Sequence, residues 1–191
     1  MLNVGDIVNH NVVEYKLSTY CNGQFGDLRS IDVSTGWNVF FFYPADFTFV
    51  CPTELGDLQE YYDELRGLGV NVYGVSTDTH FVHKAWADVS DTIKKVKYPL
   101  VGDSAHILSD VFGVLDYTTG LAQRSTFVVN PEGRVVITEQ TDDGIGRNAA
   151  ELVRKIRAAI YTREHPGEAC PAKWAQGAAT LAPSLDLIGK I

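Results

Sequence analysis

Residues 40–55, Phe-Phe-Phe-Tyr-Pro-Ala-Asp-Phe-Thr-Phe-Val-Cys-Pro-Thr-Glu-Leu, decide how this chain folds. Continuous apolar character over residues 37–43 predicts a strand that is covered on both faces. Apolar residues recur at helical spacing from Cys51 onward, so a helix is expected to begin at that cysteine. A thiol in a first helical turn feels unpaired backbone N–H groups and the macrodipole, which favour the thiolate. Cys51 is therefore predicted to be reactive, and a buried structural cysteine is the alternative interpretation.

Strands and helices alternate on both sides of this segment. Residues 70–76 read as a second buried strand, and strand, helix and strand in this order predict a βαβ unit with parallel strands. Asn22-Gly23, between residues 14–20 and 24–31, is a strong hairpin signal. The other expected elements are a helix capped by residues 77–79 and continuing to about 89, a strand over 98–101, a helix over 105–112, a hairpin of strands 125–130 and 134–140, and a helix over 147–161. The chain is thus predicted to be an α/β protein.

Prolines and glycines interrupt the chain after His165. A length of 191 residues and a hydrophobic content of 45% fit a single domain with a sizeable core. Residues 1–164 are therefore predicted to form that domain. Residues 165–191 are predicted to be a C-terminal arm, which would need another surface to pack on.

Composition excludes several classes of protein. A net charge of −8 and a pI near 5.0 argue against a nucleic-acid or anionic-membrane binder. The N-terminus does not resemble a secretory signal, and no apolar run approaches the ~18 residues of a membrane helix. Cys21, Cys51 and Cys170 are too few and too scattered for a disulfide framework. A cytoplasmic protein is expected.

Pro44, Thr48 and Cys51 form the pattern Pro-x-x-x-Thr-x-x-Cys. With its flanking residues, this pattern resembles the active-site signature of the peroxiredoxins. The resemblance covers nearly the whole chain and includes residues 73–81, 84–86, 124–130, 144–147, 165–174 and 181–187. It implies a thioredoxin-like fold of the peroxiredoxin type, with an N-terminal β-hairpin and a C-terminal arm. It also implies an antioxidant enzyme that reduces hydroperoxides with a cysteine thiolate and uses no metal or bound organic cofactor.

The same resemblance implies roles for individual residues. Cys51 would be the nucleophile, and Thr48 and Arg124 would hold the peroxide oxygens and stabilise the thiolate. Attack on an O–O bond places negative charge on the leaving oxygen, which a fixed guanidinium and a hydroxyl would stabilise. Glu54 and Arg147 would support the site through a carboxylate that orients the guanidinium groups. Without the motif, Arg124 would more often be a surface residue, and Glu54 and Arg147 an ordinary first-turn Glu and helix-start Arg.

Cys170 lies in a segment that matches the resolving-cysteine segment of the two-cysteine peroxiredoxins. A sulfenic acid on Cys51 would condense with a second thiol, which the resemblance assigns to Cys170 of a partner subunit; the residues alone leave open whether the bridge crosses subunits. The disulfide implies local unfolding around Cys51, because a sulfur held in a helix cannot otherwise meet a distant thiol. The resemblance further implies a flavoprotein disulfide reductase or a thioredoxin-like electron donor, and a homodimer that assembles into a decameric ring.

Two other functional classes fit the sequence less well. A thioredoxin-type disulfide oxidoreductase would need Cys-x-x-Cys, but Glu54 occupies the position of the second cysteine. A non-enzymatic binding or holdase protein would leave Cys51 dispensable. His80 and His83 could form a metal-binding pair, yet no third ligand is apparent nearby, so they are interpreted as surface histidines. Cys21, beside the hairpin turn, is expected to be structural or exposed.

Overall fold

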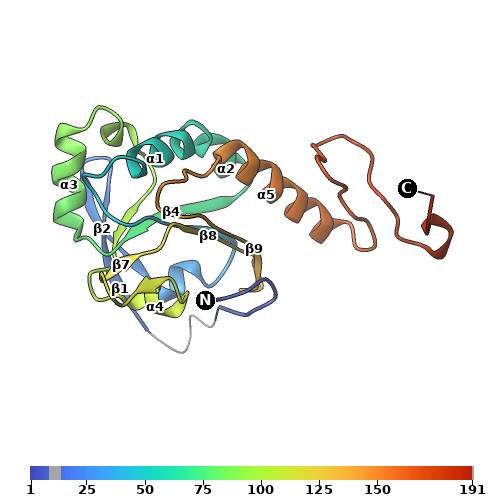
Figure 1. Ribbon diagram of the computed structural model, residues 1–191, viewed down its shortest axis with the longest axis horizontal. Coiled ribbons are helices and arrows are strands. Elements are labelled where there is room, and N and C mark those ends of the chain that lie inside the picture. Colours follow the sequence, from blue (N-terminus) through green and yellow to red (C-terminus); the bar gives the residue numbers. More distant parts are fainter. Residues whose placement is uncertain (9–13, 191) are drawn as a thin grey trace. The chain divides into compact units, whose positions relative to one another are not determined.

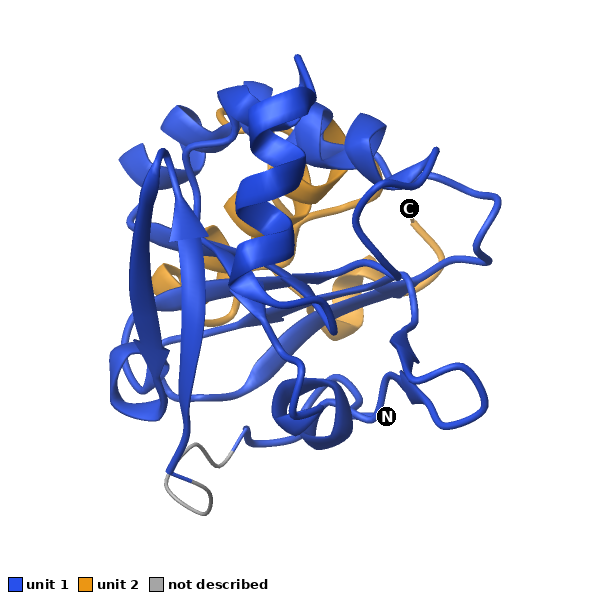
Figure 2. Ribbon diagram, turned by 90° about the vertical axis from the view of Figure 1, so that its left-hand side faces the viewer, with its two compact units in different colours: residues 1–149 blue, residues 150–191 orange. Residues whose placement is uncertain are grey.

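The computed structural model describes residues 1–8 and 14–190 and divides them into two compact units, residues 1–149 and 150–191 (Figure 2). Residues 9–13 of the predicted domain and Ile191 of the predicted arm lie outside the described residues. The sequence-based boundary at residue 165 remains a prediction about function, and it coincides with the end of a helix at Glu164.

The first unit is built on a seven-stranded mixed sheet in the order β2-β1-β5-β4-β3-β8-β9 (Figure 1). Its strands are β1 (Lys16–Cys21), β2 (Gln24–Arg29), β3 (Trp37–Phe42), β4 (Val70–Ser76), β5 (Leu100–Gly102), β8 (Ser125–Val129) and β9 (Val135–Gln140). The strands β3, β4 and β5 run parallel, as the predicted βαβ unit requires. The strand β8 pairs antiparallel with β3, and β9 pairs antiparallel with β8. The predicted hairpin of β8 and β9 therefore forms one edge of the sheet.

Helices lie on both faces of this sheet (Figure 1). They are α1 (Cys51–Glu60), α2 (Tyr62–Gly67), α3 (His80–Val89) and α4 (Ile107–Val111), with short 3₁₀ turns at η1 (Ser30–Val33) and η2 (Ile93–Lys95). A two-stranded ribbon, β6 (Leu115–Asp116) and β7 (Leu121–Ala122), was not expected. The helix predicted after Cys51 is divided at Tyr61, whose N–H bonds to the Leu58 carbonyl three residues back.

The strand β3 lies between β4 and β8 and is buried along its whole length. Phe40 and Phe42 belong to a cluster that also contains Leu108 and Phe112 on and after α4. On the other face, a Cβ at Gly74 of β4 would lie 2.8 Å from Cδ2 of Leu100, so a larger residue there would require the Leu100 side chain to shift. Burial on both faces explains why this part of the sequence is continuously apolar rather than alternating.

Local signals explain the other element ends. The hairpin of β1 and β2 turns at Asn22 and Gly23, which both have positive φ, as a two-residue turn of type I′ needs. Thr79 caps α3 by accepting a hydrogen bond from the Val82 N–H. Both features agree with the sequence-based expectation.

The second unit contains most of α5 (Ala149–Glu164) and the chain that follows it, including η3 (Leu185–Leu187). Ala169 and Leu181 pair through two backbone hydrogen bonds, which close a loop around Cys170. The Tyr161 hydroxyl donates to Glu168 at 2.8 Å, and the Trp174 ring packs 5.2 Å from the Tyr161 ring. The segment after α5 thus has its own polar and aromatic contacts.

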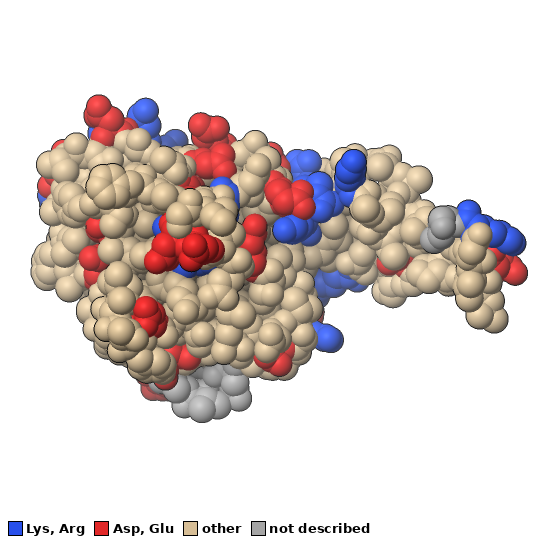
Figure 3. Space-filling view, viewed as in Figure 1, with Lys and Arg blue, Asp and Glu red and all other residues tan. Residues whose placement is uncertain are grey.

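Two global properties complete the description. Within residues 1–8 and 14–190, none of the helices combines the length and the apolar character needed to span a bilayer. On the face of the first unit drawn in Figure 3, acidic and basic side chains lie scattered among uncharged ones.

Candidate active site

Cys51 is the first residue of α1, where the sequence placed it. The strand β3 ends at Phe42, and a loop from Pro44 to Val50 carries the chain into the helix. Pro52 fits the first turn because its missing N–H would have no partner inside the helix. Cys51 is 1% exposed, so its side chain lies in the protein interior at the N-terminal, positive end of the helix dipole.

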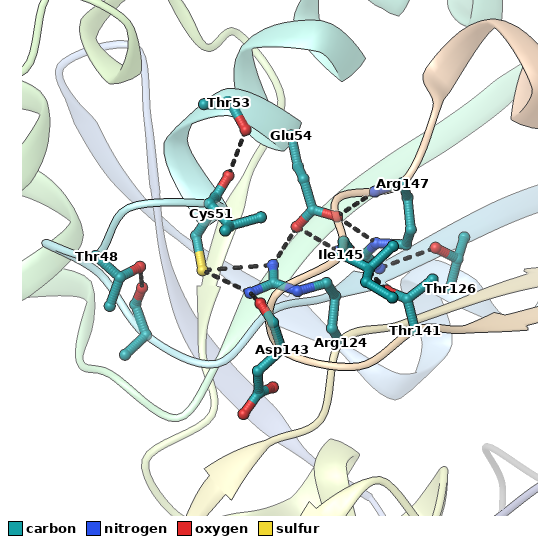
Figure 4. A network of polar contacts seen from close by, with 12 residues as sticks. Thr48, Cys51, Thr53, Glu54, Arg124, Thr126, Thr141, Asp143, Ile145 and Arg147 are labelled. Carbon is teal, nitrogen blue, oxygen red and sulfur yellow. Dashed lines mark hydrogen bonds and ion pairs between the residues drawn. The ribbon is translucent and has the colours of Figure 1, made fainter.

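The guanidinium of Arg124 faces the sulfur (Figure 4). Its two terminal nitrogens lie 3.6 and 3.7 Å from the Cys51 Sγ. Arg124 directly precedes β8 and is 3% exposed; it also donates to Glu54 and, at 3.0 Å, to the Asp143 carbonyl. Burial opposes its charge, but the hydrogen bond to Cys51 and the charge of Glu54 outweigh this effect and raise the pKa of Arg124. A charged donor is therefore fixed at the thiol.

Glu54, one turn along α1 from Cys51, joins two arginines. Its Oε1 accepts hydrogen bonds from the backbone N–H and the Nε of Arg147 at 2.7 and 2.9 Å, and its Oε2 accepts from Arg124. Arg147 also donates to Thr126 at 2.9 Å and stacks 3.4 Å from the centre of the Phe41 ring. Arg147 was expected at a helix start, but α5 begins only at residue 149, which leaves its N–H available to Glu54.

The charges in this cluster do not cancel. Two guanidinium groups, Arg124 and Arg147, share the single carboxylate of Glu54, and all three side chains are buried. Burial raises the pKa of Glu54, but hydrogen bonds from Arg147 and the charges of both arginines outweigh it and hold that pKa below its usual value. One positive charge remains without a partner in the cluster, and a thiolate on Cys51 would balance it.

Thr48 and Pro44 lie on the loop before the helix. The Thr48 hydroxyl donates to the Ala45 carbonyl at 2.8 Å, and among the described residues it has no hydrogen bond to the Cys51 sulfur. Figure 4 shows Thr48 on the side of the sulfur away from Arg124. The hydroxyl and the guanidinium therefore flank the thiol, and the half-buried Pro44 restricts the start of the loop.

A second buried carboxylate near the thiol was missed in the sequence. Asp46, on the same loop, lies 2.7 Å from the Nδ1 of His83, and the Tyr43 hydroxyl donates to it at 2.8 Å. The interpretation of His83 as a surface residue is wrong, because its side chain is fully buried; His80, one turn earlier on α3, is partly exposed.

The other two cysteines belong to other segments of the chain. Cys170 belongs to the second unit and is partly exposed; burial and the charge of Glu168 raise the pKa of its thiol, and Arg154 opposes them. Cys21, at the end of β1, donates to the Lys97 carbonyl at 3.1 Å, and burial raises the pKa of its thiol.

A buried thiol at the start of a helix, facing a fixed guanidinium, defines a site for thiol chemistry on small electrophiles. Residues 8–138 match the model of the AhpC/TSA family. The chain belongs to this family. It is a peroxiredoxin, an enzyme that reduces peroxides with a thiol.

Similar proteins agree with this assignment. The chain is 55% identical to alkyl hydroperoxide reductase C of Escherichia coli and 52% identical to that of Bacillus subtilis, each over 97% of this chain and 99% of the relative. The crystal structure of Enterococcus faecalis AhpC has a TM-score of 0.83 at 47% identity and covers 90% of this chain and 100% of its own. The reduced 2-Cys peroxiredoxin of Plasmodium vivax has a TM-score of 0.87 at 26% identity, covering 97% and 96%. The thioredoxin-like fold and the peroxiredoxin resemblance are thereby confirmed.

Proposed function

We propose that Cys51 is the peroxidatic nucleophile of this enzyme, with Arg124 and Thr48 as the groups that hold the peroxide. The observation that carries this proposal is the contact of both terminal Arg124 nitrogens with the Cys51 sulfur, at 3.6 and 3.7 Å. The positive charge left over in the Glu54 cluster supports it, because it stabilises a thiolate. Glu54 and Arg147 act by positioning Arg124, and Pro44 by restricting the loop.

The first chemical step breaks the peroxide O–O bond. The Cys51 thiolate attacks the terminal oxygen, a new S–O bond forms, and an alkoxide or hydroxide leaves and takes up a proton. Cys51 is oxidised to a sulfenic acid, and the peroxide is reduced to an alcohol or water. The Arg124 guanidinium, already at the sulfur, stabilises the charge that develops on the leaving oxygen.

The second step uses Cys170. Its thiolate attacks the Cys51 sulfenic acid, an S–S bond forms, and the departing hydroxide leaves as water. We assign this thiol to the partner subunit of a homodimer, within residues 165–191 that act as an arm on the catalytic domain 1–164. A reductase, either a flavoprotein disulfide reductase or a thioredoxin-like protein, then supplies two electrons to restore both thiols.

Substrate, assembly and location belong to the same proposal. The relatives named alkyl hydroperoxide reductase C support organic hydroperoxides as substrates, and we propose hydrogen peroxide as a further substrate. We propose that dimers associate into a decameric ring. A reducing compartment, the cytoplasm, suits an enzyme whose three cysteines are all free thiols.

Peroxide consumption with a supplied reductant tests the assignment of Cys51. Cys51→Ser is expected to lose turnover, because a serine hydroxyl is a far weaker nucleophile than a thiolate. Cys170→Ser is expected to consume one peroxide per subunit and to stop with a sulfenic acid on Cys51, detected by intact-mass spectrometry after trapping.

Cys21→Ser is the matched control, because it removes a thiol that donates to a backbone carbonyl outside the site. It should turn over as the wild type does. Unchanged turnover in Cys51→Ser would reject Cys51 as the nucleophile, and normal cycling of Cys170→Ser with its reductant would reject the resolving role alone.

A further inference from the structure

A buried histidine and a buried carboxylate hold the loop that precedes Cys51. Both side chains, His83 on α3 and Asp46 on the loop, are 0% exposed, and Nδ1 and Oδ2 are 2.7 Å apart. The second ring nitrogen of His83, Nε2, is also buried and has no hydrogen-bond partner among the described residues. Burial of a polar atom without a partner is unfavourable. The bond between Nδ1 and Asp46 is therefore the contact that fixes the orientation of this buried ring.

Asp46 connects the loop to three other places in the fold. Its Oδ1 accepts from the Tyr43 hydroxyl at 2.8 Å, and its backbone N–H donates to Asp78 at 2.9 Å. Asp78 in turn accepts from the Ser76 hydroxyl, at the end of β4, at 2.7 Å. Both the side chain and the backbone of Asp46 are thus fixed to rigid elements.

The loop changes character directly after Asp46. Phe47 has a φ of 57°, in the left-handed region that a bulky residue adopts only under strain. Its side chain is 55% exposed, although its ring still lies 6.0 Å from Trp86, and Phe49 is 92% exposed. Thr48 bonds only back to Ala45 among the described contacts. A firmly bonded residue is thus followed by a strained and weakly held segment that leads to Cys51.

We propose that the Asp46–His83 pair latches the loop before Cys51 in the closed form, and that this latch is released together with the strained segment from Phe47 onward when Cys51 forms its disulfide. This inference rests on the proposed function, since it concerns the opening that the disulfide requires. His83 contacts no reacting atom, so it is a positioning residue. It holds the closed form that reacts with peroxide and opposes the open form that reacts with the second thiol.

This role predicts that loss of the Asp46–His83 bond changes the rates of the two chemical steps by different factors. Loss of one hydrogen bond worth about 1 kcal/mol shifts the equilibrium between closed and open forms roughly fivefold towards the open form. Formation of the disulfide should accelerate by that factor, because it proceeds through the open form. Attack on peroxide should change by less than twofold, because the closed form still predominates. Damage to the fold alone would slow the peroxide step instead.

Three variants of the full-length protein test this difference. His83→Leu removes the donor to Asp46, whereas His83→Asn keeps a side-chain N–H at nearly the place of Nδ1. His80→Asn is the matched control on the same helix. Rapid-quench intact-mass spectrometry counts the sulfenic acid and disulfide forms with time after peroxide is added. We expect a fivefold faster second step in His83→Leu only, with His83→Asn and His80→Asn close to the wild type.

Hydrogen exchange of the wild type provides a second test that needs no variant. In the disulfide form, amides from Asp46 into the first turn of α1 should exchange quickly, including the Asp46 amide that is bonded to Asp78 in the closed form. An Asp46 amide that stays protected in the disulfide form, or a second step in His83→Leu that is unchanged or slower, would overturn the latch. Failure of wild-type Cys51 to react with peroxide would instead contradict the proposed function.

Discussion

Two buried carboxylates lie on either side of Cys51, Asp46 on the loop before it and Glu54 on the helix after it. Their side chains are 0% and 1% exposed, so their depth in the protein is nearly the same. Their pKa values nevertheless shift in opposite directions, upward for Asp46 and downward for Glu54. Burial alone therefore does not decide the charge of an acid in this protein.

The partners explain the difference. Burial raises the pKa of Asp46, and the hydrogen bonds and charge of its neighbours, His83 above all, offset this only in part. Burial acts in the same direction on Glu54, but two permanently charged guanidinium groups reverse the result. Glu54 is held as an anion that organises positive charge at the sulfur. Asp46 has no such cation and acts through hydrogen bonds that hold the loop.

The largest effect that the comparison predicts is on stability, for Glu54→Gln. Removing this charge leaves Arg124 and Arg147 buried with no anion between them, at an expected cost of about 3–5 kcal/mol. The free energy of unfolding in urea, measured at neutral pH and one fixed protein concentration, gives the size of the effect.

Glu60→Gln is the control for this measurement, because Glu60 is an exposed acid on the same helix. It should change the free energy of unfolding by about 0.5 kcal/mol or less. A Glu54→Gln protein as stable as the control would contradict the view that Glu54 neutralises the two arginines.

The next largest effect is on the rate of Cys51 oxidation, and it should differ between Arg124 and Arg147. Arg124→Lys keeps a positive charge, but a single ammonium cannot reproduce the planar fork that contacts the sulfur, Glu54 and the Asp143 carbonyl together. The rate constant for oxidation of Cys51 by peroxide should fall on the order of 10²-fold. Stopped-flow fluorescence at limiting peroxide measures this rate.

Arg147→Lys sharpens the same comparison. Arg147 stacks on Phe41 and bonds to Thr126, and its hydrogen bonds among the described residues do not include one to the sulfur. We expect its replacement to lower stability and to slow oxidation less than tenfold. Equal losses of rate in the two variants would mean that contact with the sulfur is not what distinguishes Arg124.

Much of the fold around the site could be predicted from local sequence. The continuous apolar run gave β3, Asn22-Gly23 gave the first hairpin, and Thr79 gave the start of α3, because each signal acts over a few neighbouring residues. The break at Tyr61 and the two-residue strands β6 and β7 were missed, since so short an element leaves almost no periodicity to detect.

The residues of the site likewise include some that could be predicted from the sequence and some that could not. Cys51, Glu54 and Arg147 could be grouped through the resemblance to a family, but the bond between Asp46 and His83 joins distant segments and has no local pattern. One signal was available: Trp86 and Ala87, three and four residues after His83, are apolar and buried, so His83 shares their face of the helix. The sequence-based interpretation treated His83 as one of a pair with His80 and did not predict the burial of this helix face.

The smallest predicted effect is a pH dependence that differs between the two carboxylates. A raised pKa means that the folded state binds the proton of Asp46 more tightly than the unfolded state does. Stability therefore falls as pH rises from the ordinary carboxyl value, about 4, through the raised pKa. The lowered pKa of Glu54 has the opposite sign: its contribution is present above the ordinary value and is lost as pH falls through the lowered pKa.

Asp46→Asn isolates the first contribution, because an amide of the same shape does not titrate. The free energy of unfolding of the wild type minus that of Asp46→Asn should grow as pH is lowered from about 7 towards 4. Asp91→Asn is an opposite-sign control, since an exposed ion pair with Lys94 lowers the pKa of Asp91. If the Asp46→Asn difference shrank on acidification, Asp46 would be held as an anion in the way Glu54 is, and the two carboxylates would not have separate roles.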